Sequence, residues 1–514
     1  MVNLKESSRT HNAISNSVVG ILSTLVTVIL NFAVRYAVIQ YLGSEINGLH
    51  NLFQSISTFL MLLEAGFSTA MVIFLYKPIQ EGNHEEIRAI MHFYAQIYTI
   101  IALVFFFCCL LIDIFFLPFL VESTIPIRKV RTYFSIFMFI TPLSYLTYSK
   151  ISILFAEQKN RVFALVSMIS QLIFRSLQII SVILTREYYI FLILMIIELV
   201  FRNLVCSRYV LREYPFLRDI KSAELSKDYK KEIYNKVRPL FVNNLASSLQ
   251  SSSQGILIGL LMGNISVVGY FGNYQLISSA IKQLFSQFGA SVTSGFGNLA
   301  VSHSDDEILL AYKKVSFILN WIAIFFCSIF FSCVQSFIQL FFGLQYVLPT
   351  MSLLLIIIEL YTSLLCVPVV SVQNALGLHK LDQYAMIIQA ISSSALGYVL
   401  GSRFGMVGIL SGLLIPQICI SLIYKGIVVN NYSYGMRALS FIKFISKEFF
   451  KGIFVICLIY FICSYINTDL MLLNMIIQAF VAIVIFMFLF LIISRNNPML
   501  TYCFSLLKSL FGDS

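Results

Sequence analysis

The sequence predicts an all-α integral membrane protein with about fourteen transmembrane helices. Hydrophobic residues make up 59% of the 514 residues and charged residues only 11%, and the mean hydropathy is +0.87. Soluble globular domains carry about 25% charged residues. Apolar runs of roughly 20 residues, the length that crosses a bilayer as a helix, recur along the whole chain. This composition excludes a soluble protein.

Proline, glycine and charged residues divide the chain into fourteen apolar segments. The first segment follows a polar stretch that ends at Asn12, and it is too long to be the core of a cleaved signal peptide. It is therefore expected to stay in the mature protein as a membrane-spanning helix. The predicted spans are 13–41, 46–76, 91–117, 132–155, 163–184, 188–209, 240–262, 269–300, 315–335, 349–371, 384–400, 406–429, 452–465 and 470–493.

The distribution of basic residues predicts that both termini are cytoplasmic. With the N-terminus in the cytoplasm, 27 of the 35 Lys and Arg residues fall in cytoplasmic segments or in the cytoplasmic parts of the predicted spans, five in external segments and three deeper inside helices. Such an excess marks the cytoplasmic side of membrane proteins. Within the largest polar segment, 211–238, apolar residues recur every four positions from Leu225 to Val237 among lysines. This pattern predicts an amphipathic helix, lying either on an anionic membrane surface or in solvent as a linker.

The two halves of the sequence match each other at a shift of about 221 residues. Gly48 aligns with Gly269, and the polar segment that begins at His84 aligns with the one that begins at Asp305. Repeats with an even number of spans share one orientation and are related by an axis along the membrane normal, an arrangement typical of transporters that bind substrate between two lobes. The predicted domains are a six-helix N-lobe, a cytoplasmic amphipathic linker, a six-helix C-lobe, and two extra C-terminal helices with a tail, at 1–210, 211–239, 240–430 and 431–514.

Polar side chains are concentrated in the seventh and eighth predicted helices. Nine of the twelve residues from Asn243 to Gln254 are polar, and several glutamines follow in the next helix. A lipid-facing helix does not tolerate such a face, so it is expected to line water or a polar cargo. The candidate cargo-binding amides are Asn243, Asn244, Gln250, Gln254, Gln275, Gln283 and Gln287.

Ionisable residues inside the predicted spans are candidates for function, because each costs about 2.5–3.5 kcal/mol to insert. Arg175 and Glu198 lie at similar depth on adjacent helices and are predicted to form a structural ion pair. Arg35, Glu64 and Lys282 lie on helices that the repeat places between the lobes, and they are predicted to be functional. No cluster of Cys and His has metal-ligand spacing, so no metal site is predicted. The ionisable residues expected at membrane depth are Arg35, Glu64, Arg175, Glu198, Lys282 and Glu359.

Several short motifs in the first 90 residues carry a resemblance to a known family. They are Tyr41-Leu42-Gly43, Asn47-Gly48-Leu49, Glu64-Ala65-Gly66-Phe67 and Tyr76-Lys77-Pro78. Together with the helix count and the repeat, they make the sequence similar to the bacterial capsule and O-antigen repeat-unit flippases of the multidrug/oligosaccharidyl-lipid/polysaccharide exporter superfamily, here called the MOP superfamily. None of these motifs is as specific as a catalytic signature.

The resemblance implies a V-shaped fold of two lobes that opens alternately to the two sides of the membrane. Its cargo would be an oligosaccharide on undecaprenyl pyrophosphate, moved from the cytoplasmic to the outer leaflet of the bacterial plasma membrane for surface polysaccharide assembly. Arg35 and Lys282 would receive the pyrophosphate, and the amides of helices 7 and 8 would contact the sugars. Expected partners are the lipid-linked cargo, membrane lipids and other polysaccharide-assembly proteins, but no nucleic acid.

Two other functions remain open at this stage. A small-molecule exporter of the same superfamily would share the fold, although such exporters resemble one another in an acidic first helix, where this chain has Arg35. A membrane polysaccharide polymerase or glycosyltransferase would need a sizeable soluble face, which the short external loops do not offer. No enzyme activity and no cofactor is expected, and coupling to Na⁺ or H⁺ is open. Glu64 is the candidate for ion coupling.

Overall fold

The computed structural model divides the chain into two compact units, Met1–Gly269 and Tyr270–Ser514. It describes residues 2–64, 66–157, 159–219, 225–302, 305–378, 381, 383–433, 435–466, 468, 470–495 and 497–500. All regular elements in these ranges are helical, as the sequence predicts. The C-terminal tail from residue 501, which the fourth predicted domain includes, lies outside the described residues.

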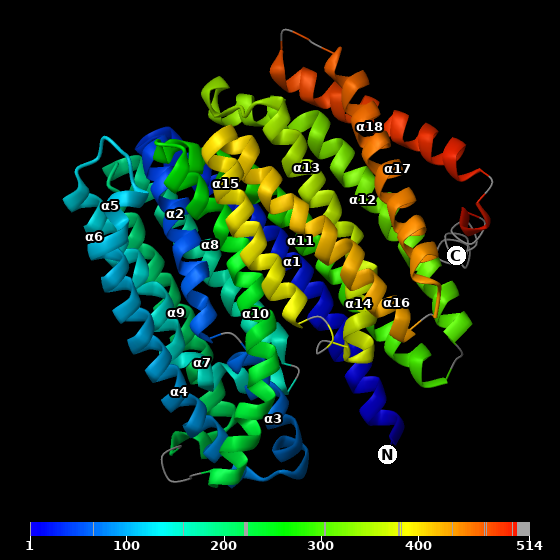
Figure 1. Ribbon diagram of the computed structural model, residues 1–514. Helices are drawn as coiled ribbons and strands as arrows, with labels where there is room; N and C mark the ends of the chain where they lie inside the picture. The colour runs from blue at the N-terminus through cyan, green and yellow to red at the C-terminus, as the bar shows by residue number, and fades with distance from the viewer. Residues whose placement is uncertain are drawn as a thin grey trace. The chain divides into compact units, whose positions relative to one another are not determined.

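Unit 1 is built from helices that pack lengthwise on their neighbours. α1 packs along α8, α8 along α9, and α4 along α7, and α10 packs along α2; α4, α7 and α9 run side by side in Figure 1. The elements are α1 (Val2–Leu42), α2 (Ser44–Leu60), η1 (Met61–Glu64), α3 (Phe67–Glu81), α4 (His84–Leu111), η2 (Ile112–Phe116), α5 (Leu117–Leu120), α6 (Ile127–Met138), α7 (Ile140–Ala156), α8 (Asn160–Thr185), α9 (Tyr188–Glu213), η3 (Pro215–Arg218) and α10 (Lys227–Leu261).

Unit 2 is organised around one long helix, α12, which contacts α13, α17 and α18. The last two helices, predicted to lie outside the repeat, therefore pack directly on this helix (Figure 1). The preceding helix, α11, begins in unit 1 and continues into unit 2. The elements are α11 (Ile265–Ser302), α12 (Asp305–Phe342), η4 (Leu344–Tyr346), α13 (Thr350–Leu365), α14 (Val367–Leu376), α15 (Gln383–Pro416), η6 (Gln417–Tyr424), α16 (Lys425–Ser433), α17 (Ala438–Ser464) and α18 (Met471–Ser494).

In the described ranges, each of the fourteen predicted spans falls mainly on helical residues, and the chain is a multi-pass membrane protein. Eight helical segments in the described ranges are both long and apolar enough to cross a bilayer by themselves. The difference between the fourteen predicted spans and these eight segments has physical causes. The second and fourth predicted spans are each divided into shorter helices, and α10 and α11 carry many polar side chains. The predicted thirteenth span is longer than expected, because α17 begins at Ala438.

Glycines break the helical path at two points, one inside the predicted second span and one between the predicted eleventh and twelfth spans. Gly66 has a φ of 87° between η1 and α3, and Gly405 has a φ of 58° where the predicted eleventh and twelfth spans meet. A side chain at either position would strain this left-handed backbone. These breaks explain why one apolar run contains more than one helix.

The helix starts support the predicted internal repeat. α2 and α11 begin at Ser44 and Ile265, and α4 and α12 at His84 and Asp305, both at a shift of 221 residues. Ile127 and Asn160, which begin α6 and α8, correspond to Thr350 and Gln383 of α13 and α15 at a shift of 223. Two polar segments that the repeat aligns therefore both begin long helices.

Residues that the repeat aligns also contact each other. A Cβ on Gly269 would lie 2.9 Å from Gly48 N, and a Cβ on Gly48 would lie 2.1 Å from Ile265 O. Nearby, the Ser266 and Ser44 hydroxyl oxygens are 3.1 Å apart. Equivalent residues meet each other close to a two-fold axis, so these contacts are those expected where two copies of one repeat meet.

The amphipathic segment after α9 does not form a separate helix. Its second half is the beginning of α10, which the Ser226 hydroxyl caps by accepting a hydrogen bond from Tyr229 N at 3.2 Å. Ile233 and Val237 are buried inside the protein, so this part of the apolar face packs within unit 1, and the choice between a membrane surface and solvent for the rest of the segment stays a prediction. Because α10 packs on α2 and α3, the compact unit extends to Gly269, beyond the predicted boundary at residue 210. The predicted lobes, defined by the repeat, remain a prediction.

Candidate functional site

Arg35 is fixed against α2 by a neutral side chain. Its Nη2 donates a hydrogen bond to Asn51 Oδ1 at 2.8 Å, and Asn51 Nδ2 in turn donates to Asn47 O at 2.7 Å. The neighbouring Asn47 amide donates to Gly269 O at 3.2 Å. An amide oxygen orients a guanidinium without cancelling its charge. This chain of amides therefore positions the Arg35 cation on a membrane-spanning helix.

Arg175 and Glu198 form the predicted ion pair. The distance from Arg175 Nε to Glu198 Oε2 is 3.6 Å, and the two side chains are 20% and 9% exposed. Gln178 bridges them, because it accepts from Arg175 Nη1 at 3.3 Å and its Nε2 lies 3.5 Å from Glu198 Oε2. The pair joins α8 to α9 inside unit 1.

A third arginine, Arg202, extends this group. It lies one helical turn after Glu198 on α9, and its guanidinium is over the Phe163 ring at 5.6 Å. It interacts electrostatically with both Glu198 and Arg175. The charge distribution of the sequence assigns Arg202 to the cytoplasmic side, but its four-residue spacing from Glu198 is the sequence signal that places it with the pair.

His50 connects Arg35 with this group. Its Nδ1 is 2.9 Å from the Tyr188 hydroxyl, and both Arg35 and Arg175 act on the ring electrostatically. We call Arg35, His50, Arg175, Glu198 and Arg202 the unit 1 cation cluster. It contains three arginines and one glutamate, so its charge is positive.

Lys282, the second predicted pyrophosphate ligand, forms an ion pair within unit 2. Its Nζ lies 2.8 Å and 3.0 Å from the two carboxylate oxygens of Glu359. The Ser363 hydroxyl donates to the same carboxylate at 3.1 Å and accepts from Gln417 Nε2, on the π-helix η6, at 2.9 Å. The sequence placed Lys282 and Glu359 in the membrane but did not pair them, because they are 77 residues apart.

The predicted sugar-contacting amides do not form one uniform face. Gln250, Gln254 and Gln275 are half-buried, whereas Asn244 on α10 and Gln283 and Gln287 on α11 are exposed. The Asn243 side chain lies outside the described residues. Part of the serine content of α10 has a local explanation, since Ser252 and Ser253 donate hydrogen bonds to carbonyls one turn earlier.

Exposed polar residues on α11 share one face. Ser279, Gln283, Ser286 and Gln287 are all exposed, and half-buried Lys282 lies beside them. Their spacing of three to four residues places them along one side of the helix. The Ser286 hydroxyl donates to Gln283 O at 2.7 Å, but exposing the amides of this face to hydrocarbon would be costly, so the face is suited to water or to a polar ligand.

Glu64 lies at the interruption between α2 and α3. Its carboxylate accepts a hydrogen bond from the Tyr98 hydroxyl of α4 at 3.4 Å, and Tyr98 stacks on Tyr145 of α7 with ring centroids 5.9 Å apart. No basic residue pairs with Glu64 among the contacts described. Acidic side chains at helix breaks inside membranes are typical sites for protons or cations.

The arrangement of helices is similar to that of several solved transporters. The inward-closed structure of the lipid II flippase MurJ matches with a TM-score of 0.67 at 16% identity, covering 94% of this chain and 99% of that chain. An inward-facing multidrug resistance MATE family transporter of the MOP superfamily matches with a TM-score of 0.61 at 14% identity, covering 84% and 98%. The chain has the fold of the MOP superfamily transporters.

A third structure marks the range of functions found with this fold. A MOP superfamily transporter from Pyrococcus furiosus, described by its reversed binding-pocket polarity, matches with a TM-score of 0.51 at 14% identity, covering 85% of this chain and 96% of that chain. The sequence matches no family model and no curated protein. At these identities the likeness shows the fold, and the choice of cargo depends on the residues of this chain.

Proposed function

We propose that this protein translocates an anionic, lipid-linked oligosaccharide across the membrane by alternating access. The observation that carries the proposal is the unit 1 cation cluster on membrane-spanning helices. In it, Arg175 pairs with Glu198, Arg202 interacts with both, and Arg35 acts on the neighbouring His50. Because charges in a low-dielectric region need compensation, such a cluster favours an anionic ligand and repels a cationic one. A diphosphate is the headgroup that polyprenyl-linked oligosaccharides carry.

In this proposal, the arginine side chains recognise the diphosphate. Guanidinium groups bind phosphate oxygens through two parallel hydrogen bonds, and Arg35 is already oriented by Asn51. Lys282 would add a second cation when the diphosphate replaces Glu359 as its partner. The sugars would contact exposed amides such as Asn244, Gln283 and Gln287, whose donors and acceptors suit hydroxyl groups.

We further propose that Glu64 couples transport to Na⁺ or H⁺. A half-buried carboxylate beside hydroxyl groups can exchange a proton or hold a cation at modest cost. Both termini are proposed to be cytoplasmic in a bacterial plasma membrane, on the basis of the charge distribution of the sequence. We also propose that the protein works together with other polysaccharide-assembly proteins.

A second candidate function is export of small molecules. It is favoured by Glu64, because an acidic residue within a membrane-spanning bundle is suited to organic cations and protons, and by the pairing of Lys282 with Glu359, which lowers the positive charge of unit 2. The unit 1 cation cluster argues against a cationic drug as the main cargo, so we place this function second.

Reconstitution into vesicles tests the two functions together. The cargo is a polyprenyl-diphosphate-linked oligosaccharide with a fluorophore on the sugar, and a membrane-impermeant quencher reports which leaflet it occupies. The matched control carries the same glycan on a single phosphate, and a fluorescent organic cation tests drug export. We expect rapid exchange of the diphosphate cargo, slower exchange of the monophosphate, and no gradient-driven uptake of the cation. Cation uptake without lipid exchange would establish the second function.

A further inference from the structure

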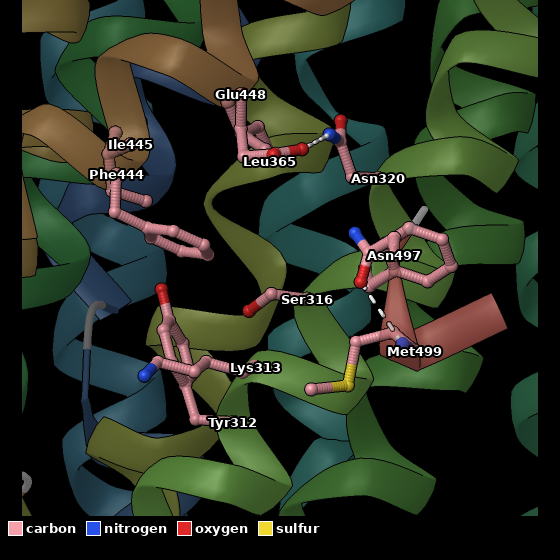
Figure 2. Close-up of a pocket in the computed structure, with 11 residues that line it drawn as sticks. Tyr312, Lys313, Ser316, Asn320, Leu365, Phe444, Ile445, Glu448, Asn497 and Met499 are labelled. Carbon is pink, nitrogen blue, oxygen red and sulfur yellow. Dashed lines mark hydrogen bonds between the residues drawn. The ribbon is translucent and has the colours of Figure 1, made fainter. Parts of the chain in front are cut away.

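Unit 2 contains a pocket of about 150 Å³ at one end of its helices, separate from the Lys282–Glu359 pair. Its lining comes from α12, α13, α17 and the segment after α18 (Figure 2). The walls are apolar at Phe317, Leu365 and Phe444. The polar lining residues are Tyr312, Lys313, Ser316, Asn320, Glu448 and Asn497.

The charge of the pocket is set by Lys313. The carboxylate of Glu448 is already used, because it accepts a hydrogen bond from Asn320 Nδ2 at 2.6 Å and pairs with Lys451. Lys451 also lies over the Trp321 ring at 5.3 Å. In the part of the chain that the structure describes, no carboxylate pairs with Lys313. The pocket therefore offers a cation to a ligand while its acid is neutralised.

Hydrogen-bond donors accompany this cation. Figure 2 shows the hydroxyl groups of Tyr312 and Ser316 turned toward each other beneath the Phe444 ring, and Asn497 lies on the opposite side of the pocket. Tyr312 and Ser316 are 1% and 7% exposed, so their polar atoms are shielded from bulk solvent. An ammonium group together with hydroxyl and amide donors is the set that binds a phosphate group.

The exposed face of α17 indicates the depth of the pocket in the membrane. Lys443, Lys447, Phe450, Phe454 and Phe461 are all exposed, and their spacing of three, four and seven residues places them on one side of the helix. Lysines near a helix end followed by aromatic residues mark the passage from lipid headgroups to hydrocarbon. Because Phe444 and Glu448 are next to these lysines in sequence, the pocket lies at the level of the headgroups.

We propose that this pocket binds the headgroup of an anionic phospholipid from the adjacent leaflet. Lys313 pairs with the phosphate. The Tyr312 hydroxyl, whose oxygen is hydrogen-bonded to Ser316, donates its own hydrogen to one of the phosphate oxygens. The volume is below the roughly 300 Å³ of pockets for drug-sized ligands, so it accommodates the headgroup but not the acyl chains. Exposed apolar side chains of α18, including Phe488 and Ile492, offer the chains a surface. This site does not depend on the proposed transport.

Thermal unfolding of the purified full chain in detergent tests the site. Short-chain phosphatidylglycerol, phosphatidylcholine and inorganic phosphate are titrated separately, since a ligand that binds the folded state raises the unfolding temperature, by an amount that grows with the logarithm of its concentration relative to the dissociation constant. We expect stabilisation by phosphatidylglycerol alone. Lys313→Gln should raise the dissociation constant for phosphatidylglycerol about ten-fold, and Tyr312→Phe, which removes only a hydroxyl, by about three-fold.

Lys443→Gln is the matched control, because it removes a lysine at the same depth but on the exposed face of α17. It should change the dissociation constant by less than about two-fold. Equal effects of Lys313→Gln and Lys443→Gln would overturn the site in favour of general surface attraction. Equal stabilisation by phosphatidylcholine or by inorganic phosphate would also overturn it. If Lys313→Gln does not fold, an unchanged affinity in Tyr312→Phe has the same meaning.

Discussion

Lys282 on α11 and Glu359 on α13 form an ion pair in which Nζ lies 2.8 Å and 3.0 Å from the two carboxylate oxygens. The lysine side chain is 34% exposed and that of Glu359 is 14% exposed, so one partner remains accessible while the other is mostly enclosed. An anionic ligand can reach Lys282, but it must compete with Glu359 for the ammonium group.

This competition predicts opposite effects of two substitutions on cargo binding. Glu359→Gln removes the competing charge and should lower the KM for a diphosphate cargo several-fold, whereas Lys282→Gln should raise it about ten-fold. KM is measured by lipid exchange in vesicles at matched protein content. Lys443→Gln is the control for loss of a lysine elsewhere. If both variants weaken binding equally, the pair has only a structural role.

Arg35 is predicted to be required for transport. Arg35→Ala removes a cation worth a few kcal/mol in a partly desolvated site, so the transport rate should fall at least about ten-fold while protein abundance is unchanged. Arg35→Lys should keep part of the activity, because the charge remains without the two-pronged geometry, and Arg35→Glu should abolish it. A well-expressed double variant, Arg35→Ala with Lys282→Ala, that transports at the normal rate would refute the diphosphate assignment.

Arg175 is predicted to act on stability more than Arg35 does. Arg175→Ala leaves Glu198 without its ion-pair partner at a site where both side chains are mostly buried, which costs about 3 kcal/mol. The melting temperature and the abundance in the membrane should both fall. Combining Arg175→Gln with Glu198→Gln should recover most of the loss, because no uncompensated charge remains. A single variant as stable as the unmodified protein would show that the pair contributes nothing.

Glu64 is predicted to govern the response to ion gradients. Glu64→Gln keeps hydrogen bonding with Tyr98 but cannot ionise, so transport should slow and lose its dependence on the coupling gradient. Tyr98→Phe should have a smaller effect, because it removes one hydrogen bond of 3.4 Å and leaves the carboxylate. Both are assayed with imposed H⁺ and Na⁺ gradients. Unaltered gradient dependence in Glu64→Gln would assign coupling to another group.

Gly48 is predicted to tolerate no side chain. A Cβ there would lie 2.1 Å from Ile265 O, so Gly48→Ala must move the backbone of α2 away from the start of α11, at a cost of about 2 kcal/mol or more. The expected result is a lower melting temperature. Gly20→Ala is the control, because a Cβ at Gly20 meets nothing within 4 Å and alanine favours the helix by about 1 kcal/mol.

The sequence alone predicted the helical membrane fold, the positions of the spans and the repeat. These features depend on local information: an apolar run of about 20 residues specifies a spanning helix, and glycines at matched positions mark equivalent turns. The pairing of Arg175 with Glu198 was also predictable, because they lie on consecutive helices joined by a short turn and at similar depth. The repeat aligns Gly48 with Gly269, and these two residues are in contact.

Only the tertiary structure decided which partner each isolated charge has. Lys282 and Glu359 are separated by a complete helix, α12, and no periodicity relates them, so their pairing depends on how α11 and α13 pack. The surroundings of the amphipathic start of α10 were also decided by the tertiary structure. An apolar stripe predicts that one face of a helix is buried, but it does not indicate whether protein or lipid covers that face. Ile233 is buried by protein, a result of packing between segments far apart in the chain.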